Sequence, residues 1–194
     1  MKSDRRIYLT GASCAGVTTL GRALADQLAV QHLDVDDFYW MPTNPPFTTK
    51  RPPEERVSLI RERQGNDGWI LTGSFDGWGD ALVNGVDLIV FVDTPTPIRL
   101  ERLLAREKER FGDRIMPGGD MHETHVAFRL WASQYDDPAF SGRNRARHEV
   151  WLADKTVPVV RLDGRHNVDD LAATVVATLA NAPGSKGLLP DRCR

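Results

Sequence analysis

A glycine-rich segment near the N-terminus has the residue types and spacing of a phosphate-binding loop. It reads Gly11-Ala12-Ser13-Cys14-Ala15-Gly16-Val17-Thr18-Thr19 and lies between an apolar run and a segment with helical spacing. Glycine allows a tight curl that turns backbone N–H groups toward one anion, and the N-terminus of the following helix adds a favourable dipole. We therefore expect the whole segment to bind the phosphates of a nucleotide, with the Thr18 hydroxyl as a Mg²⁺ ligand.

One position of this segment departs from the usual pattern. Where G-x-x-x-x-G-K-[ST] has lysine, this chain has Val17. That lysine normally reaches the outer phosphates, so another cation must meet the charge on the transferring group. The alternative interpretation is a plain glycine-rich turn that follows a strand and binds nothing.

Three aspartates stand at the end of the second apolar run, in the sequence Asp34-Val35-Asp36-Asp37, and two of them, Asp34 and Asp36, are candidate site residues. Because side chains alternate along a strand, we expect Asp34 and Asp36 to share a strand face at the carboxyl edge of the sheet, where ligands bind in open α/β folds. One carboxylate would support Mg²⁺, and the other would accept the proton of an attacking hydroxyl group. The alternative is an acidic strand end with a helix-capping aspartate.

Arginines are the expected replacement for the missing lysine. Four of them follow the fourth apolar run at spacings that place them on one helical face: Arg99, Arg102, Arg106 and Arg110. Glutamates are interleaved with them, so a solvated helix with salt bridges is an equally good interpretation. We predict that Arg102 and Arg106 act on the phosphates, with Arg143 or Arg147 next and Lys50 as a more distant choice.

The elements that must position these residues alternate between strands and helices. Short apolar runs predict five strands, at residues 7–10, 32–35, 69–72, 87–92 and 157–162. Helical spacing predicts helices at residues 18–29, 53–64, 97–110, 121–135, 143–153 and 168–179. This alternation predicts an α/β fold with a parallel sheet and helices on both faces. Residues 111–153 exceed the length of one crossover helix and are a candidate lid.

Composition limits the class of protein. The chain has 194 residues, of which 41% are hydrophobic and 27% charged, so we expect one domain over residues 1–181 and a flexible tail at 182–194. The 25 basic and 27 acidic residues give a net charge of −2, which does not favour a nucleic-acid partner. Two cysteines and the lack of a long apolar run predict a cytoplasmic protein without a membrane partner.

The loop, its strand and the following helix resemble P-loop kinases of small molecules. Residues 15–19, without lysine, are similar to the loop of bacterial phosphoribulokinases, and the Asp-x-Asp pair resembles that of shikimate and gluconate kinases. Asp-Asp-Phe-Tyr is similar to a motif of uridine and nicotinamide riboside kinases. Thr72 and the lack of a following arginine depart from nucleoside monophosphate kinases.

The resemblance to adenylate and shikimate kinase-like proteins has consequences for fold and cofactors. It implies a P-loop NTPase three-layer sandwich with a five-stranded parallel sheet in the order 2-3-1-4-5 and a helical lid insertion. It also implies ATP and Mg²⁺ as cofactors, with Asp34 nearer the metal and Asp36 nearer the acceptor.

These features predict ATP-dependent phosphoryl transfer to a small-molecule hydroxyl or phosphate acceptor, such as a metabolite, nucleoside or nucleotide. One alternative is a nucleotide-binding regulatory module that has lost catalysis together with its lysine. Another is a polynucleotide 5'-end kinase, which would need a basic track leading to the site.

Overall fold

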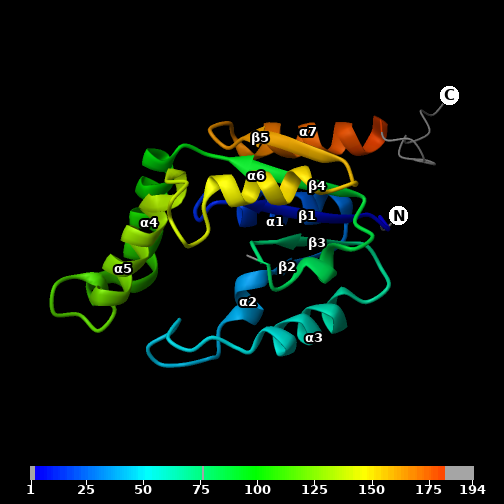
Figure 1. The fold of residues 1–194 in the computed structure, drawn as a ribbon. Coiled ribbons are helices and arrows are strands. Elements are labelled where there is room, and N and C mark those ends of the chain that lie inside the picture. Colours follow the sequence, from blue (N-terminus) through cyan, green and yellow to red (C-terminus); the bar gives the residue numbers. More distant parts are fainter. Residues whose placement is uncertain (1–2, 76, 182–194) are drawn as a thin grey trace.

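The computed structural model describes residues 3–75 and 77–181, and its centre is a five-stranded parallel sheet. The strands are β1 (Arg6–Gly11), β2 (Gln31–Asp34), β3 (Trp69–Thr72), β4 (Leu88–Asp93) and β5 (Val159–Asp163). Their order is β2-β3-β1-β4-β5, with every neighbouring pair parallel (Figure 1). The predicted fold class and strand order are therefore confirmed, while the tail predicted at 182–194 lies outside the described residues.

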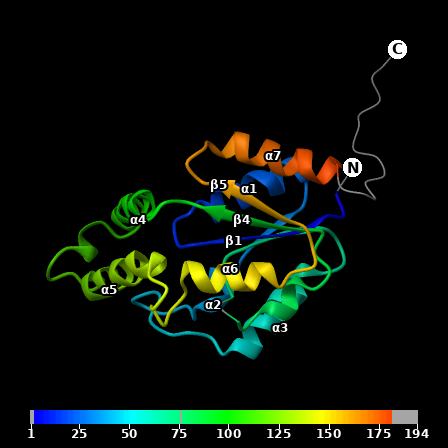
Figure 2. The same ribbon diagram turned by 45° about the horizontal axis from the view of Figure 1, so that its top comes forward.

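Helices cover both faces of the sheet. They are α1 (Val17–Leu28) and α7 (Val168–Asn181) on one face, and α3 (Pro53–Gln64) and α6 (Arg145–Ala153) on the other (Figure 2). Side chains alternate along β1, so Ile7 and Leu9 pack against α1 and α7, whereas Tyr8 packs on the opposite face of the sheet. The short 3₁₀ helix η1 (Asp80–Val83) also contributes buried side chains to that opposite face. None of the helices in the described part of the chain has the length and apolar character to cross a membrane.

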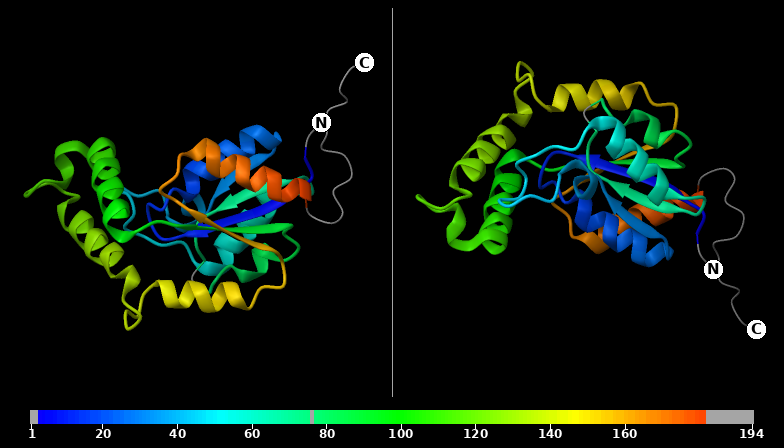
Figure 3. Two further views of the ribbon diagram at one scale, coloured as in Figure 1. Left: turned by 90° about the horizontal axis from the view of Figure 1, so that it is seen from above. Right: turned by 90° about the horizontal axis from the view of Figure 1, so that it is seen from below.

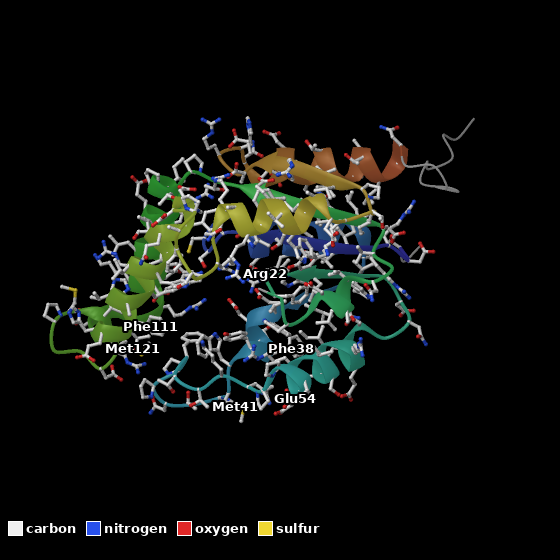
Figure 4. All side chains as sticks on the ribbon, viewed as in Figure 1. Arg22, Phe38, Met41, Glu54, Phe111 and Met121 are labelled. Carbon is white, nitrogen blue, oxygen red and sulfur yellow. The ribbon has the colours of Figure 1, made fainter. Side chains whose placement is uncertain are left out.

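An arm projects beyond the carboxyl ends of the strands (Figure 3). Its elements are α4 (Thr96–Phe111), η2 (Gly112–Ile115), α5 (His122–Ser133) and η3 (Gln134–Asp136). The buried side chains of Phe111, Ile115 and Met121 form a cluster at its outer end, and Phe47 packs against them (Figure 4). The segment 111–153, predicted as a lid, therefore divides between this arm and α6, which lies on the sheet.

A short helix that the sequence pattern did not predict, α2 (Val35–Tyr39), begins directly after β2. Asp34 caps it, since the Asp34 carboxylate accepts a hydrogen bond from the backbone N–H of Asp36 at 3.0 Å. Asp36 and Asp37 occupy the first turn, where the helix dipole favours negative charge. The expectation that Asp34 and Asp36 share a strand face is wrong, because β2 ends at Asp34 and Asp36 already belongs to α2. The alternative interpretation, a helix-capping aspartate, is correct for Asp34.

The buried guanidinium group of Arg99 attaches the arm to the rest of the molecule. Arg99 is 1% exposed, and its Nε donates to the Thr94 carbonyl oxygen at 3.1 Å. Its Nη1 donates to the carbonyl oxygens of Ser13 at 3.3 Å and Ala132 at 3.4 Å, and its Nη2 donates to the Thr96 hydroxyl. One side chain thus joins α5, the start of α4 and the glycine-rich segment.

Replacing Arg99 with leucine should lower the free energy of unfolding by about 3 kcal/mol, because several carbonyl groups lose their donor. Urea denaturation measures this change. Arg129→Leu makes the same replacement at an exposed position of α5 and should change the free energy by less than about 0.5 kcal/mol. Equal effects of the two substitutions would show that the Arg99 hydrogen bonds do not stabilise the fold.

Candidate active site

The glycine-rich segment curls around the N-terminus of α1. Cys14 and Gly16 have positive φ angles of 61° and 103°, and Gly16 is the N-cap residue of α1. Its left-handed conformation suits glycine, which lacks a Cβ. No side chain in the described part of the chain caps this helix, so its first-turn N–H groups are available to an anion.

The carbonyl groups of this loop are held from the side of α4. Thr94 Oγ1 donates to the Ala15 carbonyl oxygen at 2.8 Å, and Arg102 Nη1 donates to the same oxygen at 3.3 Å. Arg99 holds the Ser13 carbonyl in the same way. These hydrogen bonds fix the orientation of two peptide units of the loop.

The orientation of the carbonyl groups also sets the direction of the N–H groups. In a planar trans peptide the C=O and N–H bonds point in opposite directions. With the Ser13 and Ala15 carbonyls turned toward α4, the N–H groups of Cys14 and Gly16 point to the other side of the loop. The backbone therefore presents donors, as the binding of a phosphate requires.

Val17, at the position of the usual lysine, cannot supply a cation. Its side chain is 8% exposed and packs in the core with Leu20 and Leu24. Positive charge beside the loop therefore comes from other segments.

Thr18 and Asp34 form a pair of candidate metal ligands. Thr18 Oγ1 donates to Asp34 Oδ2 at 2.9 Å, which joins the first turn of α1 to the end of β2. Oxygen ligands suit Mg²⁺, which keeps several waters and usually takes one or two protein ligands together with phosphate oxygens. The described residues contain no group of three histidine, cysteine or acidic side chains able to hold a metal.

Asp36 lies in the first turn of α2, beside this pair. Solvent reaches its side chain, but the surrounding protein and then the negative charge of Asp34 raise the pKa of Asp36. The positive charges of Arg143 and Arg106 oppose this rise. A carboxylate with a raised pKa is a stronger general base, provided that it is ionised.

Two guanidinium groups face both the loop and the acidic residues. Arg143 Nη2 donates to Ser13 Oγ at 2.6 Å. Arg106 Nη2 donates to Glu107 Oε1 at 3.3 Å, whereas its buried Nε has no hydrogen-bond partner in the described part of the chain. Burial raises the pKa of the Cys14 thiol, and Arg106 opposes this rise just as it does at Asp36. Arg106 therefore acts electrostatically on both sides of the site.

The other basic residues singled out from the sequence have different surroundings. Arg102 Nη2 donates to the Gly164 carbonyl oxygen at 2.9 Å, so this side chain joins the glycine-rich loop to the turn after β5. Arg147 Nη1 donates to the Ser141 carbonyl oxygen at 2.9 Å. Lys50 is exposed and lies 5.9 Å from the centre of the Tyr39 ring.

A cavity of about 150 Å³ brings Arg143, which the sequence singled out, together with residues that the sequence pattern did not reveal. Its lining includes Tyr8, Ser74, Asp80, Arg143, His148 and Trp151. These residues come from β1, from the connection after β3 and from the region of α6, and no sequence spacing relates them. Arg143 also contacts the glycine-rich loop, so the cavity adjoins the candidate phosphate site.

Solved structures of similar fold include three named as kinases. A sugar kinase from Janibacter sp. HTCC2649 is 20% identical with a TM-score of 0.53, covering 92% of this chain and 96% of that one. Shikimate kinase from Acinetobacter baumannii is 17% identical with a TM-score of 0.54, covering 93% and 96%. A gluconokinase from Sinorhizobium meliloti 1021 is 18% identical with a TM-score of 0.52, covering 93% and 94%. The chain therefore has the P-loop fold of shikimate kinase and gluconokinase.

At the level of sequence, no family model matches the chain. A protein of Bacillus subtilis (strain 168), the uncharacterized protein YqaC, is 40% identical over 178 residues. The match covers 91% of this chain and 98% of YqaC. With this identity over nearly the whole of both proteins, the chain belongs to the family of YqaC.

Proposed function

We propose that the protein transfers the γ-phosphoryl group of ATP to a hydroxyl or phosphate group of a small molecule. The observation that carries this proposal is the Thr18–Asp34 hydrogen bond, which joins two oxygen groups beside the glycine-rich loop that would serve as Mg²⁺ ligands. Asp36 follows two residues later and is suited to accept a proton. The names of the similar structures, sugar kinase, shikimate kinase and gluconokinase, support the same class of reaction.

The nucleotide phosphates would bind to the backbone N–H groups of residues 11–19 and to the N-terminus of α1. Thr18 and Asp34 would hold Mg²⁺, which when bound neutralises charge on the phosphate oxygens. Arg99, Arg102 and Thr94 hold the loop carbonyls and so keep the N–H groups directed at the phosphates.

Transfer to a hydroxyl acceptor needs a base and a cation. The acceptor oxygen bonds to the γ-phosphorus and gives its proton to Asp36, while the bond between the γ-phosphorus and the β–γ bridging oxygen breaks and releases ADP. Arg106 and Arg143 would meet the negative charge on the phosphoryl oxygens in place of the lysine. A phosphate group as acceptor needs no general base, and Asp36 would then accept no proton.

The missing lysine favours one second candidate, a regulatory module that binds a nucleotide without turnover. The candidate functions are distinguished by measuring ADP release with a panel of acceptors: hydroxy acids, sugars, nucleosides, nucleoside monophosphates and a 5'-hydroxyl oligonucleotide. The proposed kinase releases ADP in the presence of a small-molecule acceptor. Binding of Mg²⁺-ADP without acceptor-dependent ADP release would instead identify the regulatory module, and release with the oligonucleotide alone would identify a polynucleotide kinase.

Asp36→Asn should lower turnover of a hydroxyl acceptor by a factor of about 10²–10⁴, with little change in Mg²⁺-ADP affinity. Because only the ionised carboxylate accepts a proton, wild-type turnover should fall as the pH drops through the raised pKa of Asp36, above the ordinary value of 3.8. Steady-state kinetics across the pH range measure both effects.

Asp37→Asn is the matched control for this prediction. Its carboxylate faces His32 and Arg22 rather than Arg143 and Arg106, so turnover should stay close to the wild-type value. Wild-type turnover in Asp36→Asn, or equal losses of turnover in the two variants, would show that Asp36 is not the general base.

Arg106→Ala should lower turnover by up to about 10³ with little loss of Mg²⁺-ADP affinity, because the Arg106 charge is needed mainly in the transition state. Arg102→Ala should instead weaken Mg²⁺-ADP binding, since Arg102 holds a loop carbonyl. Arg110→Ala, at an exposed position one turn further along α4, serves as the control. If Arg106→Ala and Arg110→Ala have the same turnover, Arg106 does not replace the lysine.

A further inference from the structure

Three side chains beside the phosphate loop form a continuous chain of hydrogen bonds. Tyr135 Oη and His148 Nδ1 are 2.7 Å apart, and His148 Nε2 and Ser74 Oγ are 3.2 Å apart. Tyr135 and His148 are buried, with exposed fractions of 4% and 8%. Ser74 ends the chain in the cavity that adjoins the loop. The phosphoryl transfer described above does not use these three residues.

His148 is neutral at physiological pH. Burial lowers its pKa to about 3, and the positive charges of Arg143, Arg147 and Arg145 contribute to the decrease. A neutral imidazole carries one proton, so one ring nitrogen donates a hydrogen bond and the other accepts one.

The Tyr135 hydroxyl decides which nitrogen of His148 carries the proton. Burial raises the pKa of Tyr135, so the hydroxyl keeps its proton. His148 Nδ1 is its hydrogen-bond partner within residues 3–75 and 77–181, and a buried O–H without an acceptor would cost about 1–3 kcal/mol. Tyr135 therefore donates to an unprotonated Nδ1. The imidazole proton is on Nε2, which donates to Ser74 Oγ.

This order of donors leaves the proton of Ser74 available to a ligand. The serine oxygen already accepts from His148, and its own O–H can point into the cavity. Arg143 and Arg147, which also line the cavity, carry donors and no acceptors. The Asp80 carboxylate is on the lining too, where it accepts a hydrogen bond from Trp151 Nε1 at 3.0 Å. The lining thus carries two guanidinium groups and the Ser74 hydroxyl against one carboxylate.

We propose that this cavity binds an oxyanion of the phosphoryl acceptor, with Ser74 donating its hydroxyl proton to a carboxylate or phosphate oxygen. His148 and Tyr135 are positioning residues, because they act on the acceptor through Ser74. The inference rests on the proposed function, and Arg143 connects the two sites by donating to Ser13 of the phosphate loop. The acceptor is then an acidic metabolite, either a carboxylic acid or a phosphate ester.

Nitrogen-15 NMR of histidine-labelled protein measures the proton position on His148, with His148→Gln used to assign its signals. We expect a protonated Nε2 and an unprotonated Nδ1, without titration between about pH 5 and 8. A protonated Nδ1, or titration within this range, would overturn the proposed order of hydrogen bonds.

Calorimetric titration with sodium sulfate and with sodium acetate tests the oxyanion site itself. Saturating Mg²⁺-ADP is present throughout, so that the nucleotide fills the phosphate loop. We expect one of the two anions to bind saturably and to shift the His148 signals, and to bind about tenfold more weakly to Ser74→Ala. Binding of sulfate indicates a phosphate ester, and binding of acetate indicates a carboxylic acid.

Two further variants test whether the loss of anion affinity in Ser74→Ala comes from the missing hydroxyl group. Ser74→Thr retains the hydroxyl and should recover most of the affinity, whereas Ser133→Ala, at an exposed position on α5, should leave it unchanged. Failure of both anions to bind, or equal affinity in wild type and Ser74→Ala, would overturn the proposal. Titration with Mg²⁺-ADP alone tests the nucleotide site separately, so loss of one site is distinguishable from loss of the other.

Discussion

The glycine-rich loop is oriented by side chains that donate hydrogen bonds to its carbonyl oxygens from outside, and the geometry of the candidate site follows from these hydrogen bonds. Thr94, Arg99 and Arg102 follow β4 and hold the carbonyls of Ser13 and Ala15. The N–H groups of the same peptide units must point the other way. The start of α4 therefore prepares the loop for an anion before any ligand is bound.

The arginines of α4 divide into two roles along the helix. Arg99 and Arg102, near its start, hold the loop, and Arg106, one turn further, faces the loop and Asp36. With Val17 buried in the core, the cations proposed to act on the phosphates lie in segments outside the loop. The proposed chemistry therefore depends on how the arm is attached, and the buried Arg99 is a principal attachment.

The sequence predicts the sheet, because parallel strands buried on both faces leave short apolar runs. The glycine spacing also predicts that the loop between β1 and α1 binds phosphate, and this stays a prediction. It does not predict α2, whose five residues are too few for helical periodicity. Nor does it predict the burial of Arg99, since interleaved glutamates suggest a solvated helix. The Tyr135–His148–Ser74 chain joins separate segments through tertiary packing, which no local pattern encodes.

The orientation of the loop N–H groups is tested by the amide proton shifts of Cys14 and Gly16 during titration with Mg²⁺-ADP. If the loop presents these N–H groups to phosphate oxygens, both signals should move downfield and saturate together as the nucleotide binds. Thr19, at the exposed end of the segment, provides a further signal along the same loop. Binding of Mg²⁺-ADP that leaves the Cys14 and Gly16 signals in place, or no binding at all, would show that the loop does not bind phosphate through these N–H groups.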